Sequence, residues 1–184
     1  QNLDFNSKYS DFGGTIKDGK LYITSSRNTS RKTYGWNEEP FLDIYELTQN
    51  DDGSYQTAAL VENKVNTKYH EGVASFSPDG NTMYFSRESF FEKEYEKDSI
   101  SKVKFSLLHL FQAKKSNGQW GDVQGFALNS KNYSVKNPSV SSDGNTLYFA
   151  SDMPGGYGLF DIYKASINSD GSLGEPVNLG QKVN

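Results

Sequence analysis

The residue types best suited to binding chemistry gather in one polar loop in the first third of the chain. The segment 27–40 carries Arg27, Arg31, Tyr34 and Trp36. Aromatic rings with a polar edge, and arginine side chains that stack on them, suit the binding of a peptide or a sugar. We interpret these residues as candidate contacts to a ligand or partner. The alternative is that Trp36 covers the edge of its own sheet. Further candidate contacts lie later in the chain: Arg87, Asp152 and Tyr157.

The nucleophiles and bases of known hydrolases are scarce in this sequence. It has two histidines and no cysteine, which excludes disulfides, zinc–thiolate sites and cysteine nucleophiles. Neither a G-x-S-x-G nor an H-E-x-x-H motif is present. We interpret His70 and Glu71 as a surface pair, and His109 as a structural residue. A pair of glycosidase-type carboxylates is not excluded by number, but no spacing singles one out. We therefore expect no enzymatic activity and no cofactor.

Two acidic pairs and one glycine-rich loop suggest other ligands. Asp152 with Asp161, or Asp51 with Asp52, could offer oxygen ligands to calcium, although no segment has the EF-hand spacing. The loop 154–158 resembles a phosphate cradle only superficially, because a phosphate loop leads into a helix and a strand follows here. We predict that its glycines make a tight turn, and that Asp43 and Asp161 accept backbone N–H bonds from the loops before them.

The bulk composition favours one all-β domain. The chain has 184 residues, of which 34% are hydrophobic and 14% are aromatic, with 12 Tyr and 12 Phe, and strands favour these two residue types. Its net charge of −4, with acidic and basic residues interleaved, argues against a nucleic-acid partner. The longest apolar run, 107–111, is far shorter than the roughly 20 residues of a membrane helix. The first residues carry no signal-peptide pattern, so we expect a mature or trimmed start.

A repeated pattern positions all of these residues. Asp-Gly pairs, which favour tight hairpin turns, each precede a run with an apolar-Tyr-apolar core. The pairs are Asp18-Gly19, Asp79-Gly80 and Asp143-Gly144, and the last two are assigned as structural turns. Two further strands, separated by a polar turn, follow each time. Four antiparallel strands per repeat without helical periodicity are typical of propeller blades. We therefore predict an all-β propeller segment.

The phase of the repeat sets the blade boundaries. Similar segments open at Phe5, Val65 and Leu128, and the chain ends on Val183-Asn184, where another repeat would open. We predict blades at about 1–64, 65–127 and 128–184. Propellers close with about four to eight blades. We expect either a longer protein or, less favoured, two copies that close one ring. Exposed faces of the terminal blades predict self-association, which light scattering would test.

Two stretches resemble a known family. Residues 77–87 and 142–152 look like the TolB-type, WD-repeat-like propeller motif. A closer resemblance, in residues 36–46, 66–72, 151–163 and 175–184, is to the propeller of OmpA-family outer-membrane-associated proteins of Bacteroidetes. It implies a six-bladed propeller of which this chain is the first half, a periplasmic location at the outer membrane, and a non-catalytic scaffold role. One such relative belongs to the type IX secretion and gliding apparatus, most have no assigned role, and peptidoglycan recognition belongs to the OmpA-like domain of these proteins. Leu159 and His109 depart from the family pattern.

The segment Asp98-Ser99-Ile100 resembles the O-glycosylation pattern of these bacteria. It lies in the longest insertion, 88–104, where a sugar on Ser99 would be accessible. Loops of this length without structure of their own are usually functional or disordered.

Three functions therefore compete. The first is a scaffold that binds protein partners of the cell envelope. The second is a module that binds a peptide or a glycan, with Arg31, Tyr34, Trp36 and Tyr157 as contacts on one face. The third is the propeller part of a prolyl-oligopeptidase-like peptidase, which would need a hydrolase domain that this chain lacks.

Overall fold

The computed structural model describes residues 3–62 and 64–184, which form three four-stranded antiparallel sheets. The first sheet contains β1 (Asp11–Lys17), β2 (Lys20–Ser25), β3 (Asp43–Thr48) and β4 (Ala59–Leu60). The second contains β5 (Glu71–Phe76), β6 (Thr82–Glu88), β9 (Leu108–Ser116) and β10 (Gln119–Gly125). The third contains β11 (Val135–Val140), β12 (Thr146–Ser151), β13 (Asp161–Ser166) and β14 (Val177–Asn178). The predicted all-β class and four-stranded blades are confirmed.

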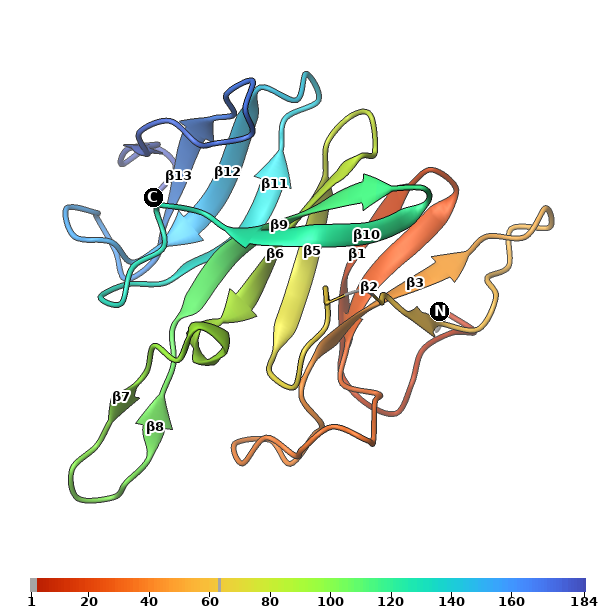
Figure 1. Ribbon diagram of the computed structural model, residues 1–184, viewed down its shortest axis with the longest axis horizontal. Coiled ribbons are helices and arrows are strands. Elements are labelled where there is room, and N and C mark those ends of the chain that lie inside the picture. The colour runs from red at the N-terminus through yellow and green to blue at the C-terminus, as the bar shows by residue number, and fades with distance from the viewer. Residues whose placement is uncertain (1–2, 63) are drawn as a thin grey trace.

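The three sheets stand side by side as neighbouring blades, with β7 and β8 outside them (Figure 1). In each blade the strands pair in sequence order, so that every connection is a hairpin. The insertion of the second blade begins with a short 3-10 helix, η1 (Ser89–Glu92). It continues as a small hairpin, β7 (Glu96–Lys97) and β8 (Lys104–Phe105), that extends away from the blades (Figure 1).

The Asp-Gly turns close through the aspartate side chains. Asp79 Oδ1 accepts bonds from Ser77 Oγ and Asn81 N, and the Asp143 carboxylate makes the same pair of contacts with Ser141 and Asn145. The following glycines have φ of 71° at Gly80 and 76° at Gly144, a region that side chains disfavour. These turns lie on the face of the blades opposite to the long loops.

Two of the three buried clusters lie between neighbouring blades. One buried cluster joins Tyr22 and Ile44 of the first blade to Phe76, Phe85 and Trp120 of the second. Another cluster joins Tyr84, Leu110 and Phe126 of the second blade to side chains of the third, among them Leu147 and Phe149. Each blade therefore buries its apolar faces by stacking on its neighbours.

An asparagine at the start of each new repeat binds the third strand of the blade before it. Asn66 Oδ1 accepts from Ile44 N at 2.7 Å, and its Nδ2 donates to Ile44 O and to Val61 O. Asn129 holds Leu110 N and O in the same way, both at 2.8 Å. Asn184 does so with Ile162, at 2.6 and 3.1 Å. We call this repeated contact the asparagine clamp.

The two outer faces of the three blades differ. On the first blade, Leu21, Ile23, Tyr45 and Leu47 form a buried cluster, against which Phe5, Tyr55, Ala58 and Leu60 pack. On the third blade, Ile162 is 38% exposed and Val183 is 58% exposed. The residues at the same repeat positions in the first blade and the connection that follows it are Ile44 and Val65, and both are fully buried. The apolar surface available for association therefore lies on the third blade.

Replacing the clamp residue should destabilise the protein. In Asn66→Ala, Ile44 N and Val61 O lose their partner, whereas Ile44 O keeps its bond from Val61 N, and each loss costs about 1–3 kcal/mol. We expect the free energy of unfolding, measured by urea denaturation, to fall by about 2–4 kcal/mol. Asn132→Ala, which removes an exposed amide from the next blade connection, is the control and should leave stability within about 0.5 kcal/mol. Equal stability of the two variants would contradict the clamp.

Candidate functional site

A cleft of about 560 Å³ opens between the long loops of the first and second blades. It lies on the face of the blades that carries the connections between their second and third strands. Its lining comes from six separate segments of the chain and is mostly aromatic or aliphatic. The principal side chains are Phe12, Tyr34, Trp36, Pro40, Leu42, His70, Glu88, Phe90, Lys104, Phe105, Ser106 and Leu108. We call it the aromatic cleft.

The first wall is a small hairpin within the loop 27–42. Tyr34 N donates to Glu39 O at 2.7 Å, and Phe41 N donates to Lys32 O at 3.0 Å. The Glu39 carboxylate accepts from Ser10 N and Ser26 Oγ, which fixes the hairpin to the blade. Trp36 stands at its tip and is 84% exposed. Its ring does not cover the sheet edge, and it is free to contact a ligand at the rim of the cleft.

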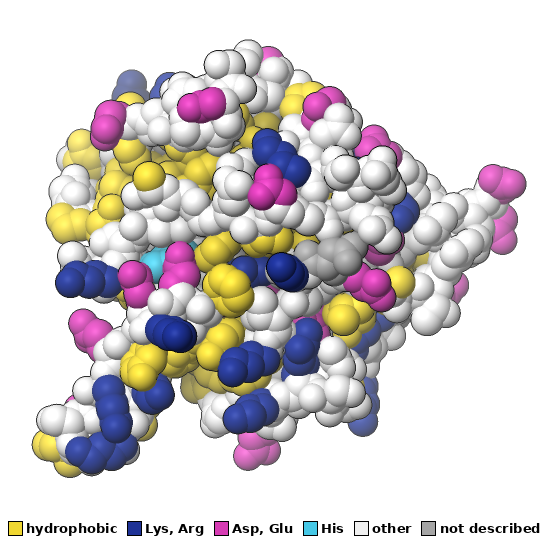
Figure 2. Space-filling view, viewed as in Figure 1, with side chains coloured by type: hydrophobic (Ala, Val, Ile, Leu, Met, Phe, Trp, Pro, Cys, Tyr) yellow, Lys and Arg dark blue, Asp and Glu magenta, His cyan; other side chains and the backbone are white. Residues whose placement is uncertain are grey.

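The second wall is the insertion of the second blade, which is folded against its own blade. Phe90 stacks on Tyr69, and Phe91 meets Phe111 edge to face. Lys104 Nζ lies 4.2 Å from the centre of the Tyr95 ring. The hairpin beyond this wall carries basic side chains (Figure 2). Phe90 and Phe91 thus fold back onto their own blade.

The floor of the cleft holds a histidine and a glutamic acid whose pKa values are shifted by burial. His70 Nδ1 accepts from Leu42 N at 3.0 Å, and burial lowers the pKa of His70 to about 4. The neutral ring therefore carries its proton on Nε2, which is buried and has no hydrogen-bond partner among residues 3–62 and 64–184. Burial raises the pKa of Glu88, whose carboxylate accepts from His70 N and Ser106 Oγ, at 3.3 and 3.2 Å.

Of the predicted contacts, Tyr34 and Trp36 line the cleft, while the three arginines are engaged inside the protein. Arg27 pairs with Asp11 at 2.6 Å. Arg31 pairs with Asp43 at 2.8 Å, so that Asp43 binds side chains of its loop, Arg31 and Asn28, rather than backbone N–H groups. Arg87 is fully buried, pairs with Glu71 at 2.9 Å, and donates to Lys64 O and Val65 O.

Asp152 and Tyr157 lie in the third blade, away from the lining of the cleft. Asp152 accepts from Ser134 N at 2.7 Å, and Tyr157 is 57% exposed. Asp161 accepts from Tyr157 N, Gly158 N and Asn178 Nδ2, and these bonds, above all that from Tyr157, lower the pKa of Asp161. Two N–H groups of the glycine-rich loop, those of Tyr157 and Gly158, are thus occupied by the protein's own carboxylate.

Neither of the two acidic pairs that could offer ligands to calcium belongs to the group of possible metal ligands in the structure. Within residues 3–62 and 64–184, the group of three such side chains is Glu92, Glu94 and His109. His109 occupies the same place at the start of its third strand as Asp43 and Asp161 do in theirs. All three residues contact the loop that precedes their strand.

Sequence reasoning identified the rim of the cleft but missed its floor and second wall. The sequence did not identify Phe12, Glu88 and Phe105 as candidate contacts. These residues line the cleft only because two blades meet there, and no local sequence pattern marks such residues. His70 was interpreted as a surface histidine, although its ring packs edge to face on Tyr34 and Phe41.

No protein-family model and no curated protein matches the chain. Among solved structures, it is similar to a puromycin hydrolase, the S511A mutant complexed with PGG, with a TM-score of 0.51 and 12% identity over 91% of this chain and 23% of that chain. TolB from Acinetobacter baumannii gives a TM-score of 0.36 and 17% identity, over 88% and 40% of the two chains. The chain thus spans less than half of either structure. At this identity the first likeness concerns the fold alone, and it agrees with the propeller class.

The buried imidazole predicts a pH dependence of stability. The pKa of His70 in the folded protein, about 4, lies below its ordinary value of 6.5, so the unfolded chain binds the additional proton between these values. We expect the free energy of unfolding to fall as the pH drops from 6.5 to 4, and to fall less steeply in His70→Gln. Urea denaturation at several pH values measures this slope, and an NMR titration gives the pKa directly. A pKa near 6.5 would contradict the buried, neutral ring.

Proposed function

We propose that this chain is a non-catalytic propeller module that binds an extended segment of a protein partner in the aromatic cleft. The observation that carries the proposal is the exposed Trp36 at the rim of an apolar cleft, opposite a second wall that contains Phe90 and Phe105. Exposed aromatic anchors beside an apolar pocket are the residues that dominate binding energy at protein interfaces. The cleft volume is within the range of ligand-binding sites.

The chemistry of the cleft favours binding over catalysis. An imidazole with a pKa of about 4 is a weak base at neutral pH, whereas a general base works best with a pKa near the operating pH. The buried Nε2–H of His70 lacks an acceptor, and buried donors are rarely left so. A carbonyl group of a bound segment could satisfy this donor once the side chains above it move aside.

The location that we propose is the periplasm, at the outer membrane, within a complex of the cell envelope. The support for this is the resemblance of the sequence to OmpA-family propellers of Bacteroidetes, including those of type IX secretion. No helix within the described residues is long and apolar enough to span a membrane. Ser99 and Ile100 are exposed at the tip of the β7–β8 hairpin, and Ile100 is 91% exposed, so a glycosylating enzyme could reach the hydroxyl.

Binding should depend on Trp36. A peptide selected from a random phage-displayed library against the purified chain serves as the probe, and its affinity is measured by calorimetry. We expect Trp36→Ala to weaken binding by about 30-fold, the effect of losing a strong interface anchor. Because the side chain is 84% exposed, stability should change by less than about 0.5 kcal/mol.

The matched control is Tyr157→Ala, which removes an exposed aromatic ring outside the lining of the cleft. Selected peptides that bind Trp36→Ala as tightly as the unaltered chain would overturn the proposal. If no peptide is selected while an oligosaccharide array shows binding that requires Trp36, the ligand is a glycan instead.

Export and glycosylation are tested together in the native host. We expect the protein in the periplasmic or outer-membrane fraction, with an intact mass above that of its polypeptide and a return to the polypeptide mass in Ser99→Ala. A cytoplasmic location would contradict the envelope assignment, and an unmodified mass would remove the glycosylation site.

A further inference from the structure

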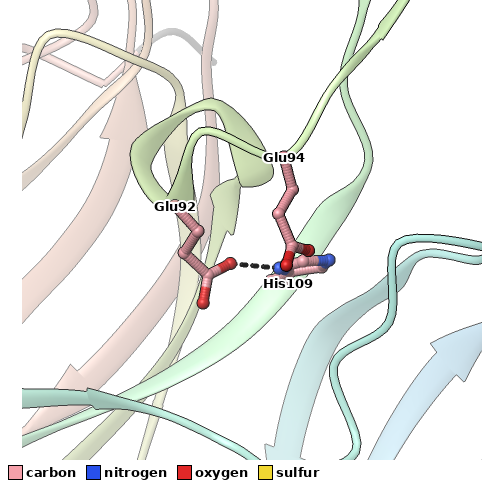
Figure 3. A group of neighbouring side chains, drawn as sticks. All are labelled: Glu92, Glu94 and His109. Carbon is pink, nitrogen blue, oxygen red and sulfur yellow. Dashed lines mark hydrogen bonds and ion pairs between the residues drawn. The ribbon is translucent and has the colours of Figure 1, made fainter.

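Two acidic side chains of the insertion converge on the buried histidine of β9. The ligand atoms of Glu92, Glu94 and His109 all lie within 4.8 Å of one another. Both carboxylates point toward the His109 ring from the turn that ends η1 (Figure 3). His109 is 1% exposed, and its Nδ1 contacts Glu92 Oε2. This group lies outside the lining of the aromatic cleft.

The backbone holds the two glutamates on one side of the turn. Lys93 between them has φ of 64°, its N–H donates to Phe90 O, and Glu94 N donates to Ser89 O at 3.1 Å. This is the Schellman pattern that ends a helix. Ser89 Oγ also donates to Glu94 O at 2.6 Å. The carboxylates are therefore placed by a defined turn rather than by a loose loop.

The other nitrogen of His109 sets the proton position of the ring. Nε2 lies 2.9 Å from Ser130 O, a carbonyl that can only accept, so Nε2 carries a hydrogen. The lone pair of a neutral ring then lies on Nδ1 and faces two carboxylates. A cation placed between these three electron-rich groups would attract all of them. A metal-binding histidine characteristically donates its second N–H to such a carbonyl.

We propose that Glu92, Glu94 and His109 bind a divalent transition-metal ion, Zn²⁺ being the best fit. Imidazole with carboxylates suits zinc, whereas calcium and magnesium prefer oxygen ligands alone. Tetrahedral zinc with bonds of about 2.0–2.2 Å places its ligand atoms ~3.3 Å apart, a small adjustment for two exposed glutamates. Three protein ligands leave one position open for water.

The surroundings allow an ion to enter. Glu94 lines a second cavity, of about 560 Å³, together with Lys93 and Lys131, so water reaches the site. No ion pair links either lysine to Glu92 or Glu94 among the described residues. The ammonium groups of these lysines would compete with a metal ion for the two carboxylates. A bound metal ion would repel them.

Metal binding would tie the insertion to the blade. In the other two blades, the residue at the start of the third strand is an aspartate that binds its loop directly, through Arg31 or through Tyr157 N and Gly158 N. His109 contacts Glu92 directly, and a shared cation would hold Glu94 to the same point. In the second blade, the inferred ion would attach the insertion to the start of the third strand. In the other two blades, direct hydrogen bonds and ion pairs attach the loops there.

The test is Zn²⁺ binding to the purified chain after removal of metals with a chelator. Calorimetry should show one Zn²⁺ per chain, and a Zn²⁺ concentration of about 100 Kd should raise Tm by about 5–10 °C. Trypsin cleavage in the insertion, which contains Lys93, Lys97 and Lys104, should slow when Zn²⁺ is present. Co²⁺ in place of Zn²⁺ should give the visible absorption of a four- or five-coordinate site. Mg²⁺ and Ca²⁺ should produce none of these effects.

Two variants make the test specific. The double variant Glu92→Gln and Glu94→Gln, and separately His109→Gln, should each weaken Zn²⁺ binding at least about 10-fold. Glu96→Gln, an exposed carboxylate of the same insertion, is the control and should bind as before. Because both glutamates are exposed, the double variant is expected to fold even if His109→Gln does not. Absence of stoichiometric Zn²⁺ binding, or unchanged affinity in the double variant, would show that a proton alone occupies the site. Neither result would affect peptide binding at Trp36.

Discussion

The asparagine clamp is the contact on which the arrangement of the blades depends. Apolar stacking favours burial of the blade faces, but it does not by itself specify how one sheet is positioned on the next. The amide of Asn66 supplies that specification, because it binds both backbone groups of Ile44 from the start of the following repeat. Asn129 repeats the contact on Leu110. Since the clamp pairs polar groups that stacking would otherwise bury unsatisfied, burial and hydrogen bonding favour the same geometry.

A second repeated position, at the start of the third strand, organises the loops that carry the candidate sites. Asp43 and Asp161 bind their loops directly, and His109 faces two carboxylates of its own insertion. The loops are thus fixed at their bases while their tips differ in length and composition. The aromatic cleft forms where two such loops meet, one with Trp36 and the other with Phe105. Binding chemistry can vary at these tips without disturbing the stacked strands.

Much of the fold could be predicted from the sequence, because Asp-Gly turns and alternating strands are local signals. The turns at Asp79 and Asp143 close as that chemistry requires. The sites were less accessible. Nothing local shows that the guanidinium of Arg87 is fully buried against Glu71, or that Glu92 and Glu94 reach His109, because both facts arise from contacts between segments. Trp36 was identified because an exposed aromatic ring in a polar loop is conspicuous without knowledge of the fold.

The sharing of two of the three buried clusters by neighbouring blades has a consequence for cooperativity. A blade whose core is completed by side chains of its neighbour cannot fold stably alone. Its folding equilibrium is therefore coupled to that of the neighbour. The second blade contributes to both clusters, through Phe85 on one side and Tyr84 on the other, and is therefore coupled twice. Local opening should begin at the edges, and amide protons of β6 should exchange with solvent last. The three blades therefore behave as a short one-dimensional array. The second blade, at its centre, determines how cooperatively the whole chain unfolds.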